Sequence, residues 1–212
     1  MACTARSVRP ARRAALRERN SPPSLALLWS EAVLTSRVGA PVRGRAGKRA
    51  VELGAGCGLA GIVASKLGAA AVTLTDLAPA LPLLEENARA ILGEHAAGAG
   101  AAGASAARWR VAELSWGDNS HVIGTFDVVI IADCMYVPEA IDPLVATLVA
   151  LTLPETSLVY MSYGRNRRAL RAFLLASAAA GFVWELARPS EYDAVYKSSD
   201  TCIVRGRRLI IN

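Results

Sequence analysis

The chain has 212 residues, 53% apolar side chains and a formal net charge of +6. This length allows one domain with a sizeable buried core, and the apolar fraction excludes a globally disordered protein. No stretch offers the roughly 18 strongly apolar, uncharged residues that a membrane-spanning helix needs, so we expect no membrane association.

The positive charge is concentrated at the N-terminus. Residues 1–20 hold 6 arginines and 1 acidic residue, which leaves 18 basic (24 − 6) and 17 acidic (18 − 1) side chains for the other 192 residues. A body so close to neutral attracts polyanions weakly, and a nucleic-acid partner is therefore not expected. The basic start, followed by Ser-Pro-Pro-Ser, predicts a disordered tail or an organelle transit peptide over residues 1–23, ahead of a single domain over residues 24–212. We expect a cytoplasmic protein, with an organelle as the alternative.

The cysteines and histidines form no pattern typical of a metal site. The four cysteines are far apart and include no CxxC pair, and the chain has only two histidines. We therefore predict a reduced intracellular protein without a bound metal.

Hydrophobic spacing predicts seven strands and five helices. The expected strands are short apolar runs bounded by turn residues, at 49–53, 71–75, 108–112, 126–132, 157–162, 182–187 and 201–210. The expected helices carry apolar residues at three- and four-residue spacing, at 24–38, 58–67, 79–92, 138–151 and 166–180. The glycine/alanine-rich residues 93–107 are expected to form a loop.

Strands that alternate with helices indicate an α/β fold. We expect a doubly wound, Rossmann-like sheet of seven mostly parallel strands, with ligands at the carboxyl ends of the strands. The last two strands follow each other without a helix between them, so a terminal hairpin should place one antiparallel strand in the sheet.

The most informative segment reads VELGAGCGLAGIVASKLGAAAVTLTD, from Val51 to Asp76. It predicts a strand, a glycine-rich turn, a helix and a second strand that ends in an acid, which is typical of a nucleoside site. No GK[ST] sequence follows the glycines, which excludes the lysine-bearing phosphate loop. Asp76 lies 22 residues beyond Gly54, where a carboxylate can accept both ribose hydroxyls of either NAD or S-adenosylmethionine.

Glu52 lies inside the end of the first strand, where an unpaired carboxylate costs several kcal/mol. A ligand ammonium group, a water near the turn or a salt bridge to an arginine would make the position tolerable. Glu52 together with the GxGxG turn and the terminal hairpin favours S-adenosylmethionine, and we include Glu52 among the predicted cofactor-binding residues.

Five segments resemble one family: LWSEAV, VELGAGCGLAGIVASKLGA, VTLTD, ELSWG and FDVVIIADCMY. They are similar to methyltransferase family 16, the seven-strand protein-lysine methyltransferases, and most of all to its methyltransferase-like 21 group. The resemblance covers about residues 25–210, and the DxxY signature of Asp133 and Tyr136 is its most specific part. It implies a class I S-adenosylmethionine-dependent methyltransferase that modifies a lysine of a protein such as a chaperone or an elongation factor. We expect a monomer.

The resemblance also implies roles for individual residues. In the family the cofactor is contacted by a tryptophan of the first helix, the glycine turn, the acid after the second strand, the WG tryptophan and the residue before the DxxY aspartate. These positions are Trp29, Gly54, Ala55, Gly56, Asp76, Trp116 and Ala132. The catalytic pair would be Asp133 and Tyr136, which we expect to orient the target amine.

Simpler interpretations of these residues stay open at this point. Trp29 and Trp116 could be core aromatics, Asp133 could cap the helix that follows it, and Tyr136 could simply pack.

Other functions also remain open. The chain could methylate a nucleic acid or a small molecule, although it lacks the [N/D]-P-P-[Y/F] run of exocyclic-amine enzymes and the proline that accompanies a cytosine-C5 cysteine. It could also be a catalytically weak, cofactor-binding interaction protein, because little sequence precedes the Trp29 helix. A dehydrogenase is not supported, since no catalytic histidine or Tyr-x-x-x-Lys is found.

Overall fold

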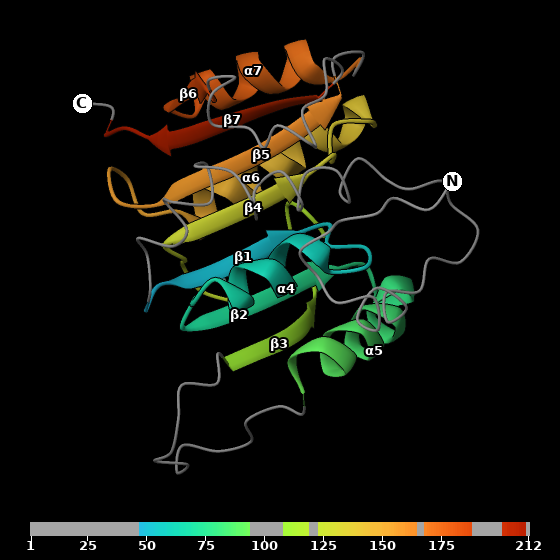
Figure 1. Cartoon of the computed structure of the whole chain (residues 1–212). Helices are drawn as coiled ribbons and strands as arrows, with labels where there is room; N and C mark the ends of the chain where they lie inside the picture. Colours follow the sequence, from blue (N-terminus) through green and yellow to red (C-terminus); the bar gives the residue numbers. More distant parts are fainter. Residues whose placement is uncertain (1–46, 94–107, 119–122, 165–167, 188–200, 211–212) are drawn as a thin grey trace.

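The computed structural model describes residues 47–93, 108–118, 123–164, 168–187 and 201–210. Within these residues seven strands form one sheet in the order β3-β2-β1-β4-β5-β7-β6 (Figure 1). The predicted helix at 24–38, with Trp29, lies outside the described residues, as does nearly all of the glycine/alanine segment.

The strands agree closely with the hydrophobic pattern. They are β1 (Arg49–Leu53), β2 (Ala71–Asp76), β3 (Arg108–Glu113), β4 (Val128–Ala132), β5 (Leu158–Gly164), β6 (Phe182–Leu186) and β7 (Thr201–Arg208). The fourth strand begins two residues later than expected, because Phe126 forms only an isolated bridge with Thr152.

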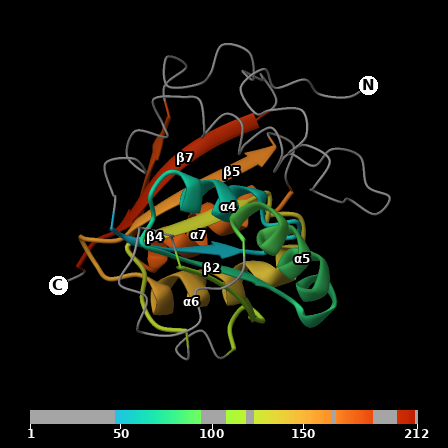
Figure 2. The ribbon, with the colours of Figure 1, turned by 60° about the horizontal axis from the view of Figure 1, so that its bottom comes forward.

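Helices cover both faces of the sheet. They are α4 (Leu59–Lys66), α5 (Leu81–Leu92), α6 (Ile141–Leu151) and α7 (Leu170–Ala179), with short 3-10 turns η1 (Ala78–Ala80) before α5 and η3 (Pro138–Ala140) before α6. Helices α4 and α5 lie on one face and α6 and α7 on the other, as Figures 1 and 2 show together. None of the helices in the described part of the chain is long and apolar enough to cross a membrane.

Strand β4 lies at the centre of the sheet, and this explains its unbroken apolar run. All five of its residues are buried. Val128, Ile130 and Ala132 belong to the core under α4 and α5, whereas Val129 and Ile131 belong to the core under α6 and α7. A strand between two helical layers has no solvent-facing side, so it does not alternate between apolar and polar residues.

The direction of the strands confirms the predicted fold class. β1 is parallel to β2 and β4, β2 to β3, and β4 to β5. β7 runs antiparallel to both β5 and β6, so one reversed strand lies between the fifth and sixth strands.

The connections bring the loops after β1, β2 and β4 together at the carboxyl ends of these strands. Leu53 at the end of β1 is in register with Thr75 of β2 and with Ile131 of β4. The chain leaves β1 toward β2 on one side, while β4 leads to β5 on the other. The carboxyl ends of β1, β2 and β4 therefore meet where the strand order reverses, which is the usual ligand position in such sheets.

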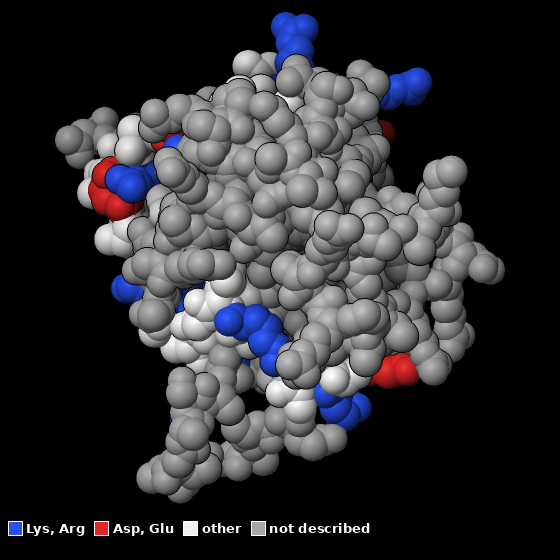
Figure 3. All heavy atoms as spheres, viewed as in Figure 1, with Lys and Arg blue, Asp and Glu red and all other residues white. Residues whose placement is uncertain are grey.

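Figure 3 shows the charges on the face seen in Figure 1. The lysine and arginine side chains of the described residues lie in separate groups on this face and do not form one continuous patch.

Candidate functional site

The glycine turn connects β1 to α4 through residues 54–58. Gly54, Gly56 and Gly58 all have left-handed backbone conformations, with φ of 59°, 53° and 81°. Glycine adopts this region without the steric cost that a β-carbon brings. The amide of Ala55 donates to the carbonyl of Thr75 at 2.8 Å, and this bond ties the turn to the end of β2.

The first two glycines of the turn have opposite surroundings. A β-carbon at Gly54 would lie 2.9 Å from the Sγ atom of Cys134 and 3.2 Å from the ring of Trp116. A β-carbon at Gly56 would meet no atom of the described residues within 4 Å. The turn is therefore packed against protein at Gly54 and faces open space at Gly56.

Asp76 lies beside the open part of the turn. Its Oδ2 atom accepts a hydrogen bond from the Gly56 amide at 2.7 Å, and its Oδ1 atom accepts one from the Leu77 amide at 2.7 Å. A carboxylate oxygen can accept two hydrogen bonds, so both oxygens can also receive hydroxyl groups. The arrangement suits a ribose bound against Gly56.

Glu52 lies beneath the turn. Its side chain is buried, and Oε2 accepts a hydrogen bond from the Gly61 amide at 2.7 Å. Burial raises the pKa of Glu52 to about 8, although the backbone amides of Gly61 and Ala60 act in the opposite direction. Among the described residues the partner of this carboxyl group is thus the backbone of α4, and not the arginine that the sequence left open. Direct contact of Glu52 with a bound cofactor stays a prediction.

The segment after β4 begins with a strained residue. Asp133 has a left-handed φ of 58°, which is uncommon for a residue with a β-carbon, and its amide donates to the carbonyl of Ser162 at 2.9 Å. The 3-10 turn that follows has Val137 as its N-cap without a side-chain hydrogen bond. The alternative role of Asp133 as a helix cap is therefore wrong.

Tyr136 and Cys134 of the same segment differ in exposure. Tyr136 is 64% exposed, so its side chain does not serve as a packed core residue. Its pKa is raised by partial burial and by the nearby Cys134, Asp76 and Asp133, which keeps the hydroxyl protonated at neutral pH. Cys134 is buried, and burial raises the pKa of its thiol, so a nucleophilic thiolate is disfavoured.

Trp116 reaches the site from the loop after β3. It is partly buried, and its ring packs over Gly54. The loop is attached to α6, because the amide of Gly117 donates to Oγ1 of Thr147 at 2.8 Å and the α-carbon of Gly117 faces Pro143. Trp116 packs against the core under α6 and α7, which agrees with the core-aromatic alternative, and its contact with a bound cofactor stays a prediction. Sequence reasoning missed Thr147, whose signal is a polar residue within an apolar helical stretch.

Nearly all the predicted site residues therefore meet at one edge of the sheet. The structure brings together Gly54, Ala55, Gly56, Asp76, Trp116, Ala132, Asp133 and Tyr136, with Glu52 below them. Trp29 lies outside the described residues. Across the described ranges no group of three histidine, cysteine or acidic side chains could hold a metal ion.

Comparison with known proteins agrees with this arrangement. The model of the lysine methyltransferase family matches residues 25–178, and the chain belongs to this family. Protein N-lysine methyltransferase METTL21A of Danio rerio is 37% identical over 129 residues, which cover 58% of this chain and 55% of that protein. EEF1A lysine methyltransferase 3 of Mus musculus is 34% identical over 146 residues, 68% of this chain and 58% of that protein. The chain thus spans a little over half the length of these relatives.

Solved structures support the fold. Magnesium protoporphyrin IX methyltransferase (ChlM) from Synechocystis PCC 6803, with bound SAH, superposes with a TM-score of 0.57 and 14% identity, and the match covers 93% of each chain. At this identity the likeness concerns the fold alone.

Proposed function

We propose that this chain transfers a methyl group from S-adenosylmethionine to the ε-amine of a lysine in a protein substrate. One observation carries the proposal. The glycine turn and the DxxY segment lie side by side, with Cys134 packed against Gly54, so the predicted donor and acceptor sides share one site. Membership of the lysine methyltransferase family supports the same reaction.

The residues of the turn fit the cofactor. Gly56 faces open space beside the carboxylate of Asp76, which can accept the two ribose hydroxyls. Trp116 and Ala132 border the same edge of the sheet and would hold the remainder of the molecule. S-adenosylmethionine supplies an activated methyl group, so the protein has to align the acceptor and exclude water.

Asp133 and Tyr136 would act on the acceptor amine. A free lysine has a pKa of about 10.4, so only a few molecules in ten thousand are neutral at pH 7. Removal from water lowers the pKa of an amine, and a neutral amine can attack a methyl group. The backbone of Asp133 is held by the bond from its amide to Ser162, and we assign its carboxylate to orienting the amine and accepting its proton. The Tyr136 hydroxyl would supply a second polar contact.

The substrate in this proposal is a protein. One relative is named for EEF1A and another for N-lysine methylation of proteins. We extend this to a translation factor or a chaperone as the substrate of this chain, with the protein acting as a cytoplasmic monomer. The near balance of 18 basic and 17 acidic side chains outside residues 1–20 gives less support to a nucleic-acid substrate.

The proposal can be tested in two steps. Calorimetric titration with S-adenosylhomocysteine, with NADH as the control ligand, should show binding of the former alone. Cell extract with a radiolabelled methyl donor should then yield a labelled protein whose label is in methyl-lysine. Asp133→Asn and Tyr136→Phe should each lower turnover at least about 100-fold, within the range for removal of a positioned acid–base group. Wild-type turnover in both variants would contradict the roles of this pair, and label in nucleic acid would contradict the substrate class.

A further inference from the structure

Three segments meet at Gly54, and we call Gly54, Trp116 and Cys134 the Gly54 clamp. The distances are short: a β-carbon at Gly54 would lie 2.9 Å from Sγ of Cys134 and 3.2 Å from Cζ2 of Trp116. Atoms closer than about 3.4 Å to a β-carbon are tighter than ordinary van der Waals contact. These contacts therefore leave no room for a β-carbon at position 54 or for a larger side chain at position 134.

The two side chains of the clamp have different supports. The loop of Trp116 is held by α6, through the bond from the Gly117 amide to Thr147. Cys134 lies between β1 and β4, because its thiol is 3.4 Å from the carbonyl of Leu53 and 3.5 Å from the carbonyl of Ala132 and can donate to either. The clamp therefore connects three parts of the fold that are far apart in the chain.

Cys134 lies just beyond the last residue pair of the β1–β4 ladder. Leu53 and Ile131 form the final pair of the β1–β4 ladder. Beyond it the backbones separate, Gly54 entering its turn and Asp133 adopting its left-handed conformation. The thiol of Cys134 lies between the two segments, next to Gly54 and near the carbonyl of Leu53.

From this geometry we propose that Cys134 is a positioning residue for the methyl transfer, and the inference rests on the proposed function. Cys134 stands between Asp133 and Tyr136 in the chain and touches the turn that would hold the cofactor. It sets the separation of the methyl donor from the acceptor amine by its size and by its hydrogen bond. It forms no covalent bond during the reaction.

The size of the side chain is the property to test. Cys134→Leu adds volume where Gly54 leaves no room, so it should push the turn away. Cys134→Ser keeps a donor toward Leu53 with nearly the same shape. Cys202→Leu is the matched control, because Cys202 on β7 is a second buried cysteine, at 8% exposure against 4% for Cys134.

The first readout is the binding of S-adenosylhomocysteine together with kcat on the natural substrate. Cys134→Leu should weaken binding at least about 10-fold and lower kcat by a similar factor, whereas KM for the protein substrate changes less than about 3-fold. Cys134→Ser and the folded Cys202→Leu should stay within about 3-fold of wild type in all three quantities. Equal losses in Cys134→Leu and Cys202→Leu would show a general effect on stability and would overturn the proposal.

The second readout needs no cofactor. In a double-mutant cycle on urea unfolding, Cys134→Ala should offset part of the midpoint loss caused by Gly54→Ala, because it removes the atom nearest to the new β-carbon. Gly54→Ala combined with Cys202→Ala should be additive. Additivity in both pairs would contradict the clamp. A wild-type protein that binds no S-adenosylhomocysteine would instead overturn the proposed function, and with it the positioning role, whatever the cycle shows.

Discussion

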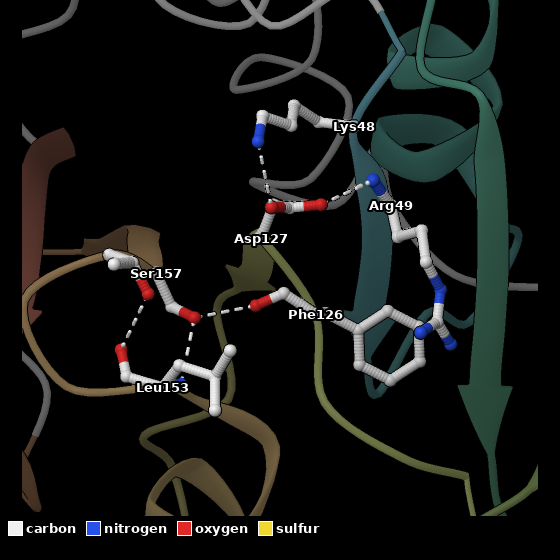
Figure 4. A network of polar contacts seen from close by, with 7 residues as sticks. Lys48, Arg49, Phe126, Asp127, Leu153 and Ser157 are labelled. Atoms are coloured by element: carbon white, nitrogen blue, oxygen red, sulfur yellow. Dashed lines mark hydrogen bonds and ion pairs between the residues drawn. The ribbon is translucent and has the colours of Figure 1, made fainter.

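The amino ends and the carboxyl ends of the central strands are built differently. At the amino ends of β1 and β4, polar side chains bind neighbouring side chains and backbone groups (Figure 4). Asp127 forms an ion pair with Lys48 at 3.2 Å and accepts a hydrogen bond from the Arg49 amide at 2.8 Å. The guanidinium of Arg49 lies 5.0 Å from the centre of the Phe126 ring, and Ser157 donates to the Phe126 carbonyl at 2.6 Å.

At the carboxyl ends of β1 and β2 the acidic side chains bind backbone amides of the glycine turn, of the residue after β2 and of α4. Asp76 accepts from Gly56 and Leu77, and Glu52 accepts from Gly61. These bonds orient the carboxyl group of Asp76 beside Gly56, whereas Glu52 is buried and, with its pKa raised to about 8, keeps its proton at neutral pH. This difference indicates which end of the strands can bind a ligand. Asp127 at the amino ends is paired with a lysine, whereas Asp76 at the carboxyl ends is held by backbone amides next to Gly56, where the hydroxyl groups of a ligand can reach it.

The largest expected effect concerns the buried acid at the carboxyl end of β1. The pKa of Glu52 is raised from 4.5 to about 8 by burial. Between these values the unfolded chain releases the proton while the folded chain keeps it, so the free energy of unfolding falls as the pH rises from 4.5 to about 8, and then levels off. The accumulated loss should be on the order of 5 kcal/mol, at about 1.36 kcal/mol per pKa unit between 4.5 and about 8.

Glu52→Gln should remove this dependence, because the amide has a similar shape and cannot ionise. Urea unfolding of both proteins from pH 5 to pH 9 gives the comparison. Parallel curves for wild type and variant would show that Glu52 does not titrate in this range.

A smaller loss is expected for Gly61→Ala. The added β-carbon would collide with the side chain of Leu74 and lie 2.8 Å from Oε2 of Glu52. Overpacking of a core costs about 1–3 kcal/mol, and the better helix propensity of alanine returns up to about 1 kcal/mol. We expect a net loss of about 2 kcal/mol in the free energy of unfolding, measured by urea titration. An unchanged midpoint would mean that Glu52 and Leu74 move aside freely.

Asp76→Ala should weaken the binding of S-adenosylhomocysteine. Loss of the carboxylate removes the acceptor for ribose hydroxyls, and a lost hydrogen bond to a charged group costs about 1.5–3 kcal/mol. The affinity for S-adenosylhomocysteine should fall by about 30-fold, measured by calorimetry. Asp76→Asn is the matched variant, since it keeps an acceptor oxygen, and it should lose less. Equal affinity in wild type and Asp76→Ala would contradict a ribose site at this carboxylate.

The smallest loss of free energy of unfolding is expected for variants at the amino ends of the strands. Asp127→Asn removes the ion pair with Lys48 but can still accept from the Arg49 amide, so the free energy of unfolding should fall by about 1 kcal/mol or less. Lys48→Ala should cost less still, because both partners are partly exposed. Binding of S-adenosylhomocysteine should not change in either variant. A weaker ligand affinity would show that the two ends of the strands are coupled, contrary to the comparison.

Much of the fold follows from hydrophobic spacing alone. β1 has the predicted bounds, and the helix predicted at 58–67 is found as α4 at Leu59–Lys66, followed by Gly68 with its left-handed φ of 99°. These features depend on neighbouring residues in the chain, so a local pattern predicts them. The alternation of strands and helices then limits the topology to a few arrangements.

The sequence by itself therefore determined the class of fold and the family, because the alternation of strands and helices and the five family segments are local features of the chain. The roles of the individual site residues stay predictions. Only the tertiary structure decided what each residue touches. Cys134 meets the carbonyl of Leu53 across 81 positions of the chain, and Glu52 meets the amide of Gly61. Periodicity shows which face of an element is buried, but the neighbour on that face depends on how separate strands and helices are brought together in the packed domain.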